Sequence, residues 1–218
     1  MFVRIAVATI LAACALQARA EDLSAAQRAI FNTPHLANIT EPMTLRYTYK
    51  HQGTLEQAFD DIVDVTITKV MPDGGRDVSF NFLSDKHHQD FPVVEGFHSN
   101  PVIMMFLEHD VAGLSSQTGG STLYFRNRIR DAFVDRATAE EVTVPYGGEE
   151  VPATHVMLQP FLQDPMRERF EKFAEKSYEF YLAPDVPGGV YSIRVLTPGG
   201  SADKPLEENL LQFQDTVQ

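Results

Sequence analysis

Alternation of apolar and polar residues with a period of two is the feature that most constrains how this chain can fold. In residues 43–50, MTLRYTYK, an extended chain would carry on one side Met43, Leu45, Tyr47 and Tyr49. The same alternation returns in residues 59–70, FDDIVDVTITKV, and 76–83, RDVSFNFL. This period is typical of half-buried β-strands. Between the last two segments, MPDGGR has the proline, aspartate and glycines of a hairpin turn, so an antiparallel meander is predicted.

Two further hairpins are predicted from the same period. Residues 140–161, EEVTVPYGGEEVPATHVMLQPF, are expected to turn at Gly147 and Gly148. Residues 177–196, SYEFYLAPDVPGGVYSIRVL, are expected to turn near Pro187, Gly188 and Gly189. Residues 90–97, DFPVVEGF, are predicted to extend the first meander by one strand.

Helices are predicted where this alternation gives way to a longer period. A short helix is expected at residues 23–31, and a longer one at 100–114 that begins at Asn100 and Pro101, a good N-cap and first-turn pair. Apolar residues lie on nearly every side of its first two turns, which predicts a helix buried all round. The Met104-Met105 pair lies within these turns.

Two amphipathic helices are predicted further along the chain. The first has one apolar stripe formed by residues four apart: Phe125, Ile129 and Phe133. The second is short, spans residues 165–175 and separates the last two hairpins. Its side chains expected to face inward are Met166, Phe170 and Phe173.

These segments predict a single α+β domain over residues 21–218, because no linker or repeat divides them. We expect a curved antiparallel β-sheet, like half of a barrel, with the helices packed on its concave side. This arrangement resembles the half-barrels of bacterial periplasmic lipid-binding and lipoprotein-carrier proteins. The resemblance concerns architecture alone, and no residue role is taken from it.

The first twenty residues, MFVRIAVATILAACALQARA, are typical of a signal peptide. Arg4 precedes an apolar run over residues 5–16, and Ala18-Arg19-Ala20 is the small-x-small pattern that a signal peptidase accepts. The predicted location is therefore periplasmic or secreted. An alternative is cleavage before Cys14, whose preceding Leu-Ala-Ala resembles a lipobox and would give an acylated lipoprotein.

Composition narrows the classes of partner. Hydrophobic residues make up 44% of the chain and charged residues 22%, as in globular proteins. The formal charge of −12 becomes −14 if Arg4 and Arg19 leave with the signal peptide. Such an acidic chain is unsuited to nucleic acid, which requires a cationic face. No later stretch approaches the roughly 20 apolar residues of a transmembrane helix.

Residues 114–133, LSSQTGGSTLYFRNRIRDAF, can be interpreted in two ways. Backbone N–H groups after the glycines, together with Ser121, Thr122 and Arg126, could bind an anion at a helix start. Alternatively, the glycines end one helix and Ser121 caps the next, with the arginines on its polar face. On a helix Arg126 and Arg130 share one flank and Arg128 lies on the other, which favours the junction.

The interval between residues 84 and 110 is rich in histidine and offers weak candidates for a metal site: His87, His98 and His109. Imidazole with nearby carboxylates suits zinc or copper. The chain contains no HExxH or CxxC motif and no histidine pair spaced four apart on a helix. We therefore expect no metal and no other cofactor.

The sequence gives equally little indication of catalysis, because it contains neither a GxSxG nor a GxxxxGK[ST] motif. A non-enzymatic protein is favoured. We expect it to hold an apolar or lipid-like ligand, or an apolar segment of a partner, in a cavity between sheet and helix lined by Tyr47, Phe80, Met105 and Phe106. The alternatives are an envelope assembly factor without a small ligand, and an enzyme acting on an anionic substrate near Ser121 and Arg126.

Overall fold

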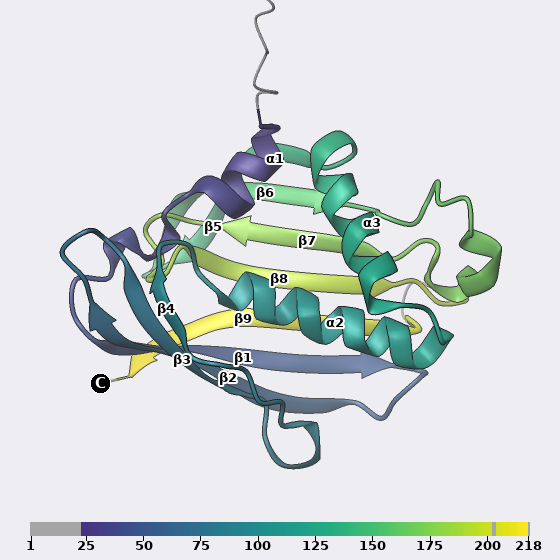
Figure 1. Ribbon diagram of the computed structural model, residues 1–218, viewed down its shortest axis with the longest axis horizontal. Helices are drawn as coiled ribbons and strands as arrows, with labels where there is room; N and C mark the ends of the chain where they lie inside the picture. Colours follow the sequence, from purple (N-terminus) through teal and green to yellow (C-terminus); the bar gives the residue numbers. More distant parts are fainter. Residues whose placement is uncertain (1–22, 202–203, 218) are drawn as a thin grey trace, which may run out of the picture.

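A single antiparallel sheet organises the molecule. The computed structural model describes residues 23–201 and 204–217, and within them nine strands follow the order β4-β3-β2-β1-β9-β8-β7-β6-β5. The sheet is open and curved, and the helices lie against its concave face (Figure 1). The predicted α+β half-barrel is therefore confirmed. The predicted signal peptide and Cys14 lie outside the described residues.

The first meander consists of β1 Met43–Gly53, β2 Phe59–Val70, β3 Arg76–Phe82 and β4 Val94–Phe97. On β1 the predicted alternation holds, because Leu45, Tyr47 and Tyr49 are buried beneath the helices. The fourth strand is shorter than the predicted segment 90–97 and pairs with β3 at only two positions. Pro92, which lacks an N–H donor, lies just before it.

The second half of the sheet contains β5 Thr138–Tyr146, β6 Glu149–Leu158, β7 Ser177–Leu182 and β8 Val190–Thr197. Gly147 and Gly148 form the predicted turn with φ angles of 63° and 88°. Gly188 and Gly189 lie in the second turn and also have positive φ. Both hairpins are therefore where the sequence predicted them.

The last strand, β9 Glu207–Val217, was not predicted, although it lies in the middle of the sheet. It pairs with β1 on one side and β8 on the other and so joins the two halves. Its inward-facing residues include Glu207 and Asn209 as well as Leu211 and Phe213. Because two of its buried residues are polar, β9 lacks the alternation of apolar and polar residues from which the other strands were predicted.

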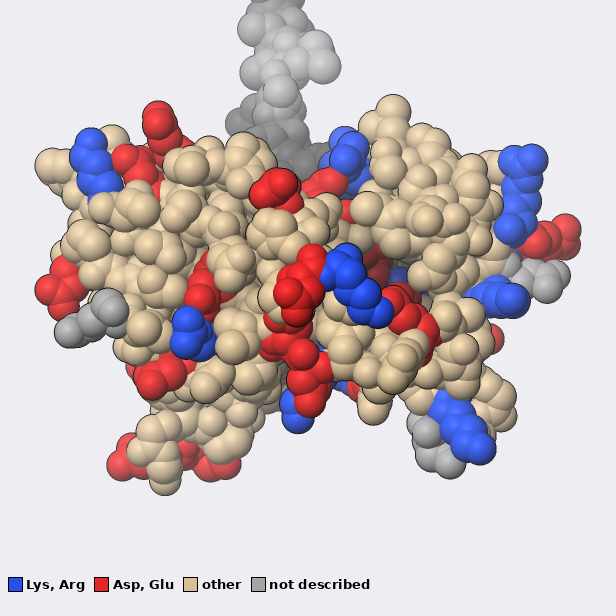
Figure 2. Space-filling view, turned by 90° about the horizontal axis from the view of Figure 1, so that it is seen from below, with Lys and Arg blue, Asp and Glu red and all other residues tan. Residues whose placement is uncertain are grey.

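The outer face of the sheet is polar. Arg46 on β1 donates two hydrogen bonds of 2.8 Å to Asp64 on β2, and Arg194 bridges Glu179 and Glu208 on the neighbouring strands. Figure 2 shows one face of the molecule, where a group of acidic side chains lies near the middle beside a basic one and charges of both signs are scattered elsewhere.

The helical segments are α1 Ala25–Gln27, η1 Arg28–Asn32, η2 His35–Asn38, η3 Asp85–His87, α2 Val102–Thr118, α3 Thr122–Asp135 and η4 Arg167–Phe173. Continuous α1 and η1 correspond to the helix predicted at residues 23–31. The helix predicted at 165–175 is an irregular η4 with a kink at Phe170. Phe170 and Phe173 are buried as expected, whereas Met166 is exposed.

Helix α2 begins one residue later than predicted, with Pro101 as its N-cap, and it is not buried all round. The Asn100 side chain accepts a hydrogen bond of 3.0 Å from the Val102 N–H and donates to the Tyr47 hydroxyl and the Gly188 carbonyl. This anchors the helix start to both halves of the sheet. One face of α2 packs on the sheet through residues such as Phe106, but Met104 on its other side is 39% exposed.

The junction between α2 and α3 confirms the structural interpretation of residues 114–133. Gly119 has a φ of 69°, and its N–H donates to the Ser115 carbonyl, which ends α2. Ser121 then occupies the N-cap of α3 with an extended backbone. Among the described residues its hydroxyl makes no capping hydrogen bond.

Candidate ligand-binding groove

An apolar groove of about 450 Å³ lies between α2, α3 and the N-terminal helical segment. Its volume falls within the roughly 300–1,000 Å³ of known ligand pockets. The buried part consists of Leu107, Val111, Ile129 and Phe133. The groove is therefore formed by the three helices and not by the sheet.

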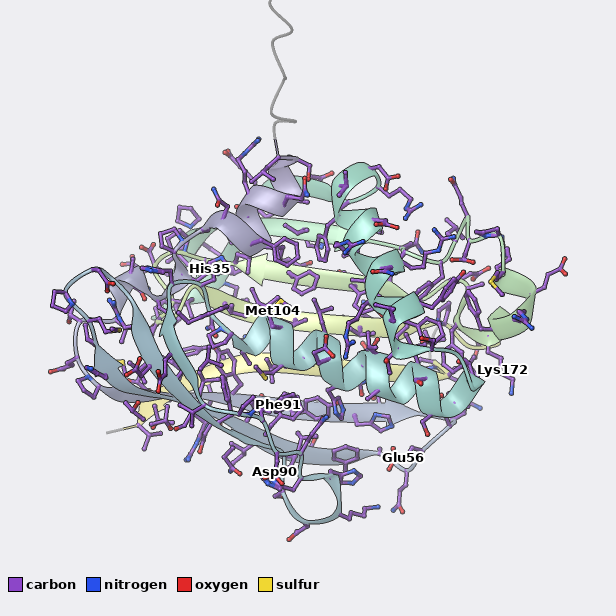
Figure 3. The ribbon with its side chains drawn as sticks, in the orientation of Figure 1. His35, Glu56, Asp90, Phe91, Met104 and Lys172 are labelled. Atoms are coloured by element: carbon purple, nitrogen blue, oxygen red, sulfur yellow. The ribbon has the colours of Figure 1, made fainter. Side chains whose placement is uncertain are left out.

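Large apolar side chains stay exposed around this groove. Phe31 is 43% exposed, Met104 39% and Leu123 61%, although each lines the cavity. Figure 3 shows Met104 on α2, in the space toward the N-terminal helix. Clustered exposed apolar residues mark a binding surface more often than isolated ones do. This groove is the strongest candidate for an apolar ligand.

Helical periodicity explains which side chains meet in the groove. On α2 the lining residues are spaced by three and four: Met104, Leu107, Glu108 and Val111. On α3 a similar row runs through Leu123, Arg126, Asn127 and Arg130. The turn at Gly119 brings these two rows to face each other.

Charged residues of both signs lie around the groove. Arg126 on α3 donates hydrogen bonds of 2.6–2.9 Å to both carboxylate oxygens of Glu108 on α2. These bonds raise the pKa of Arg126 above its ordinary value. Arg130 is 71% exposed and lies 3.7 Å from Asp131, farther than a direct hydrogen bond. The lining residues themselves are one acid and two bases, and Asp131 lies beside Arg130.

The four predicted ligand residues lie in or against the core. Tyr47 and Phe106 are completely buried, and burial raises the pKa of the Tyr47 phenol. Phe80 and Met105 are half-buried and pack against the same core. Other residues line the groove and the cavities described below. The binding role of these four residues stays a prediction.

The three residues predicted to bind an anion are not brought to one cavity. Ser121 lines a separate cavity of about 440 Å³ with Arg169, whereas Arg126 lies in the groove and is paired with Glu108. Thr122 is the first residue of α3. On the opposite flank, Arg128 contacts Asp164 at 2.7 Å, in agreement with the predicted separation of the arginines.

The histidine candidates are divided between two places. His87 and His109 line a common polar cavity, while His98 lies beside Gly74 in the turn between β2 and β3. In the part of the chain that the structure describes, no three His, Cys, Asp or Glu side chains are placed to hold a metal ion.

Sequence reasoning missed the two residues that best define the groove, Met104 and Leu123. Both lie on predicted helices, so their type and position were visible. Their exposure was not, because it depends on how three separate helical segments pack. Within residues 23–201 and 204–217, no helix is long and apolar enough to cross a membrane.

The fold and groove together define an open antiparallel half-barrel with an apolar groove between its covering helices. No family model and no curated protein match this chain. The crystal structure of the lipoprotein LppX of Mycobacterium tuberculosis aligns with a TM-score of 0.30 at 10% identity, covering 78% of this chain and 84% of that one. A LolA superfamily protein from Nitrosomonas europaea aligns with a TM-score of 0.24 at 7% identity, covering 88% and 92%. Likenesses this weak carry no argument about function.

Proposed function

We propose that this protein is an exported, non-enzymatic carrier that holds a lipid-like ligand in the groove between α2, α3 and η1. The observation that carries this function is the exposure of Phe31, Met104 and Leu123 around a cavity of about 450 Å³. Contact between water and these apolar side chains is unfavourable in free energy, and an acyl chain in the groove would displace that water. Export is inferred from the signal-like first twenty residues.

An amphiphile with an anionic head suits the groove better than a neutral hydrocarbon. Arg130 lies among the lining residues with most of its side chain in solvent, and Glu108 balances only Arg126. A carboxylate or phosphate near Arg130 would gain a charge-assisted hydrogen bond. The apolar tail would then lie over Val111 and Ile129.

Binding of a dansyl-labelled fatty acid tests this function. In wild-type protein we expect saturable fluorescence enhancement. Leu123→Glu places a charge beside the apolar tail and should weaken binding at least about tenfold, because burial of a leucine side chain contributes about 1.5–3 kcal/mol.

Val134→Glu is the matched control. Val134 lies on the same helix, is 52% exposed and does not line the groove, so this variant should bind like wild type. Equal weakening by both variants would contradict the groove as the binding site. Absence of saturable binding in wild-type protein would contradict the carrier function and favour the assembly factor.

A further inference from the structure

A second, polar cavity of about 260 Å³ lies on the other side of α2 from the groove. Its chemically active residues come from distant parts of the chain: His51, Glu56, His109, Asp110, Glu207 and Asn209. Glu56, in the loop between β1 and β2, is half exposed at its edge (Figure 3). The cavity is smaller than most pockets for drug-sized ligands, which begin near 300 Å³.

The cavity has a negative charge that its buried lysine does not cancel. Lys176 is 1% exposed, and its ammonium contacts Asp110 at 2.5 Å and Glu207 at 3.0 Å. With Glu56 included, three carboxylates surround the cavity and one ammonium lies behind them. Burial lowers the pKa of His109, so this imidazole stays neutral at neutral pH. The carboxylates therefore outnumber the ammonium by two, which favours a cationic ligand.

Hydrogen bonding within the cavity leaves one buried nitrogen of His51 without a partner among the described residues. His51 Nδ1 lies 2.6 Å from the Asn209 side-chain oxygen, so this nitrogen carries the proton and donates. Nε2 of the same ring has no partner among the described residues, although His51 is 95% buried. A buried polar atom without a hydrogen-bond partner destabilises the site, so a ligand that pairs with this nitrogen is favoured.

The imidazole of His109 also carries a proton on Nδ1. Its Nδ1 lies 2.9 Å from the Gln89 side-chain oxygen and donates to it, so Nε2 accepts from the Tyr49 hydroxyl at 3.4 Å. Both nitrogens of His109 therefore have partners, and the atoms left for a ligand are His51 Nε2 and the carboxylate oxygens of Glu207 and Glu56. A ligand that supplies several N–H donors and a positive charge would satisfy all of them.

We propose that this cavity binds a small organic cation with a primary ammonium group, which donates to His51 Nε2 and the Glu207 carboxylate and is further attracted by Glu56. The site is independent of the groove, because the two cavities share no lining residue.

Calorimetric titration with putrescine at constant ionic strength tests the cation site. We expect saturable binding of putrescine and none of butanediol, which has a similar shape but no charge. Glu56→Gln should weaken binding about fivefold, the factor given by one charge contact in water. Asp60→Asn is the matched control, because it removes the same charge from an exposed residue outside the cavity.

A second readout reports the buried acceptor directly. Putrescine should shift the Nε2 resonance of His51 in the nitrogen NMR spectrum of wild-type protein, since that nitrogen gains a donor. Three results would overturn the site: no saturable binding, equal binding of butanediol, or equal weakening by Glu56→Gln and Asp60→Asn. The last would indicate general attraction to the acidic surface (Figure 2).

Discussion

Lys176 is a charged residue that is almost completely buried, between two carboxylates. Its ammonium lies between Asp110 of α2 and Glu207 of β9, and Asp110 also accepts a hydrogen bond of 2.6 Å from Tyr178 of β7. Burial lowers the pKa of Lys176, but the two carboxylates outweigh it and hold the pKa above its ordinary value. The lysine therefore stays charged and joins the helix to two strands.

Replacing Lys176 should lower the free energy of unfolding, because its two carboxylate partners stay buried. Lys176→Met leaves two carboxylates unpaired in the core, and we expect the free energy of unfolding to fall by about 3–5 kcal/mol in urea titrations. Lys50→Met, at an exposed position on β1, should change it by less than about 0.5 kcal/mol. Equal stability of both variants would show that the charge cluster contributes little.

The same cluster predicts how stability depends on pH. Burial raises the pKa of Glu207, but Lys176, with His51 and Asn209, outweighs it and lowers the pKa below the ordinary 4.5. A carboxyl with a lowered folded pKa contributes fully above its unfolded pKa, and the contribution is lost as pH falls through the folded pKa. We expect the Glu207 contribution to the free energy of unfolding to be lost below about pH 4.5 in urea titrations followed by circular dichroism, and to be absent in Lys176→Met, where the main cause that lowers this pKa is gone.

At the scale of elements, a glycine within helix α2 and the glycine at its C-terminal cap should respond oppositely to substitution by alanine. Gly119 has a left-handed φ of 69°, so Gly119→Ala should destabilise by about 1 kcal/mol. Gly113 lies within the helix, and a Cβ there meets nothing within 4 Å, so Gly113→Ala should stabilise by about 0.5–1 kcal/mol. Thermal unfolding measures both, and shifts of the same sign would contradict the assigned helix boundary.

Most elements could be predicted from local pattern, and the failures have physical reasons. The limits of β2 agree with the segment predicted at residues 59–70, because its β-branched residues alternate cleanly. Strand β9 was not predicted because two of its buried residues, Glu207 and Asn209, are polar and make polar contacts instead of packing in the apolar core. The exposure of Met104 was not predicted, because apolar residues lie on nearly every side of the first turns of α2. Tertiary packing alone decides which of them remain exposed to solvent.

At the scale of the whole molecule, the candidate site depends on how three helical segments cover one sheet. The sequence predicted an apolar ligand but placed it between sheet and helix, near Met105 and Phe106. The structure has an apolar groove between the helices, where Met104 lies, and a binding role for Met105 and Phe106 stays a prediction. Neighbouring residues on one helix face different sides, about 100° apart, so Met104 and Met105 have different surroundings.

Methionine methyl NMR during titration with dodecanoate tests the central claim most directly. The methyl group of Met104 should shift progressively and saturate as the acyl chain enters the groove, while that of Met105 should stay nearly unchanged. A shift of Met105 with Met104 unaffected, or no shift of either methyl group, would contradict a lipid-like ligand in the groove between α2, α3 and η1.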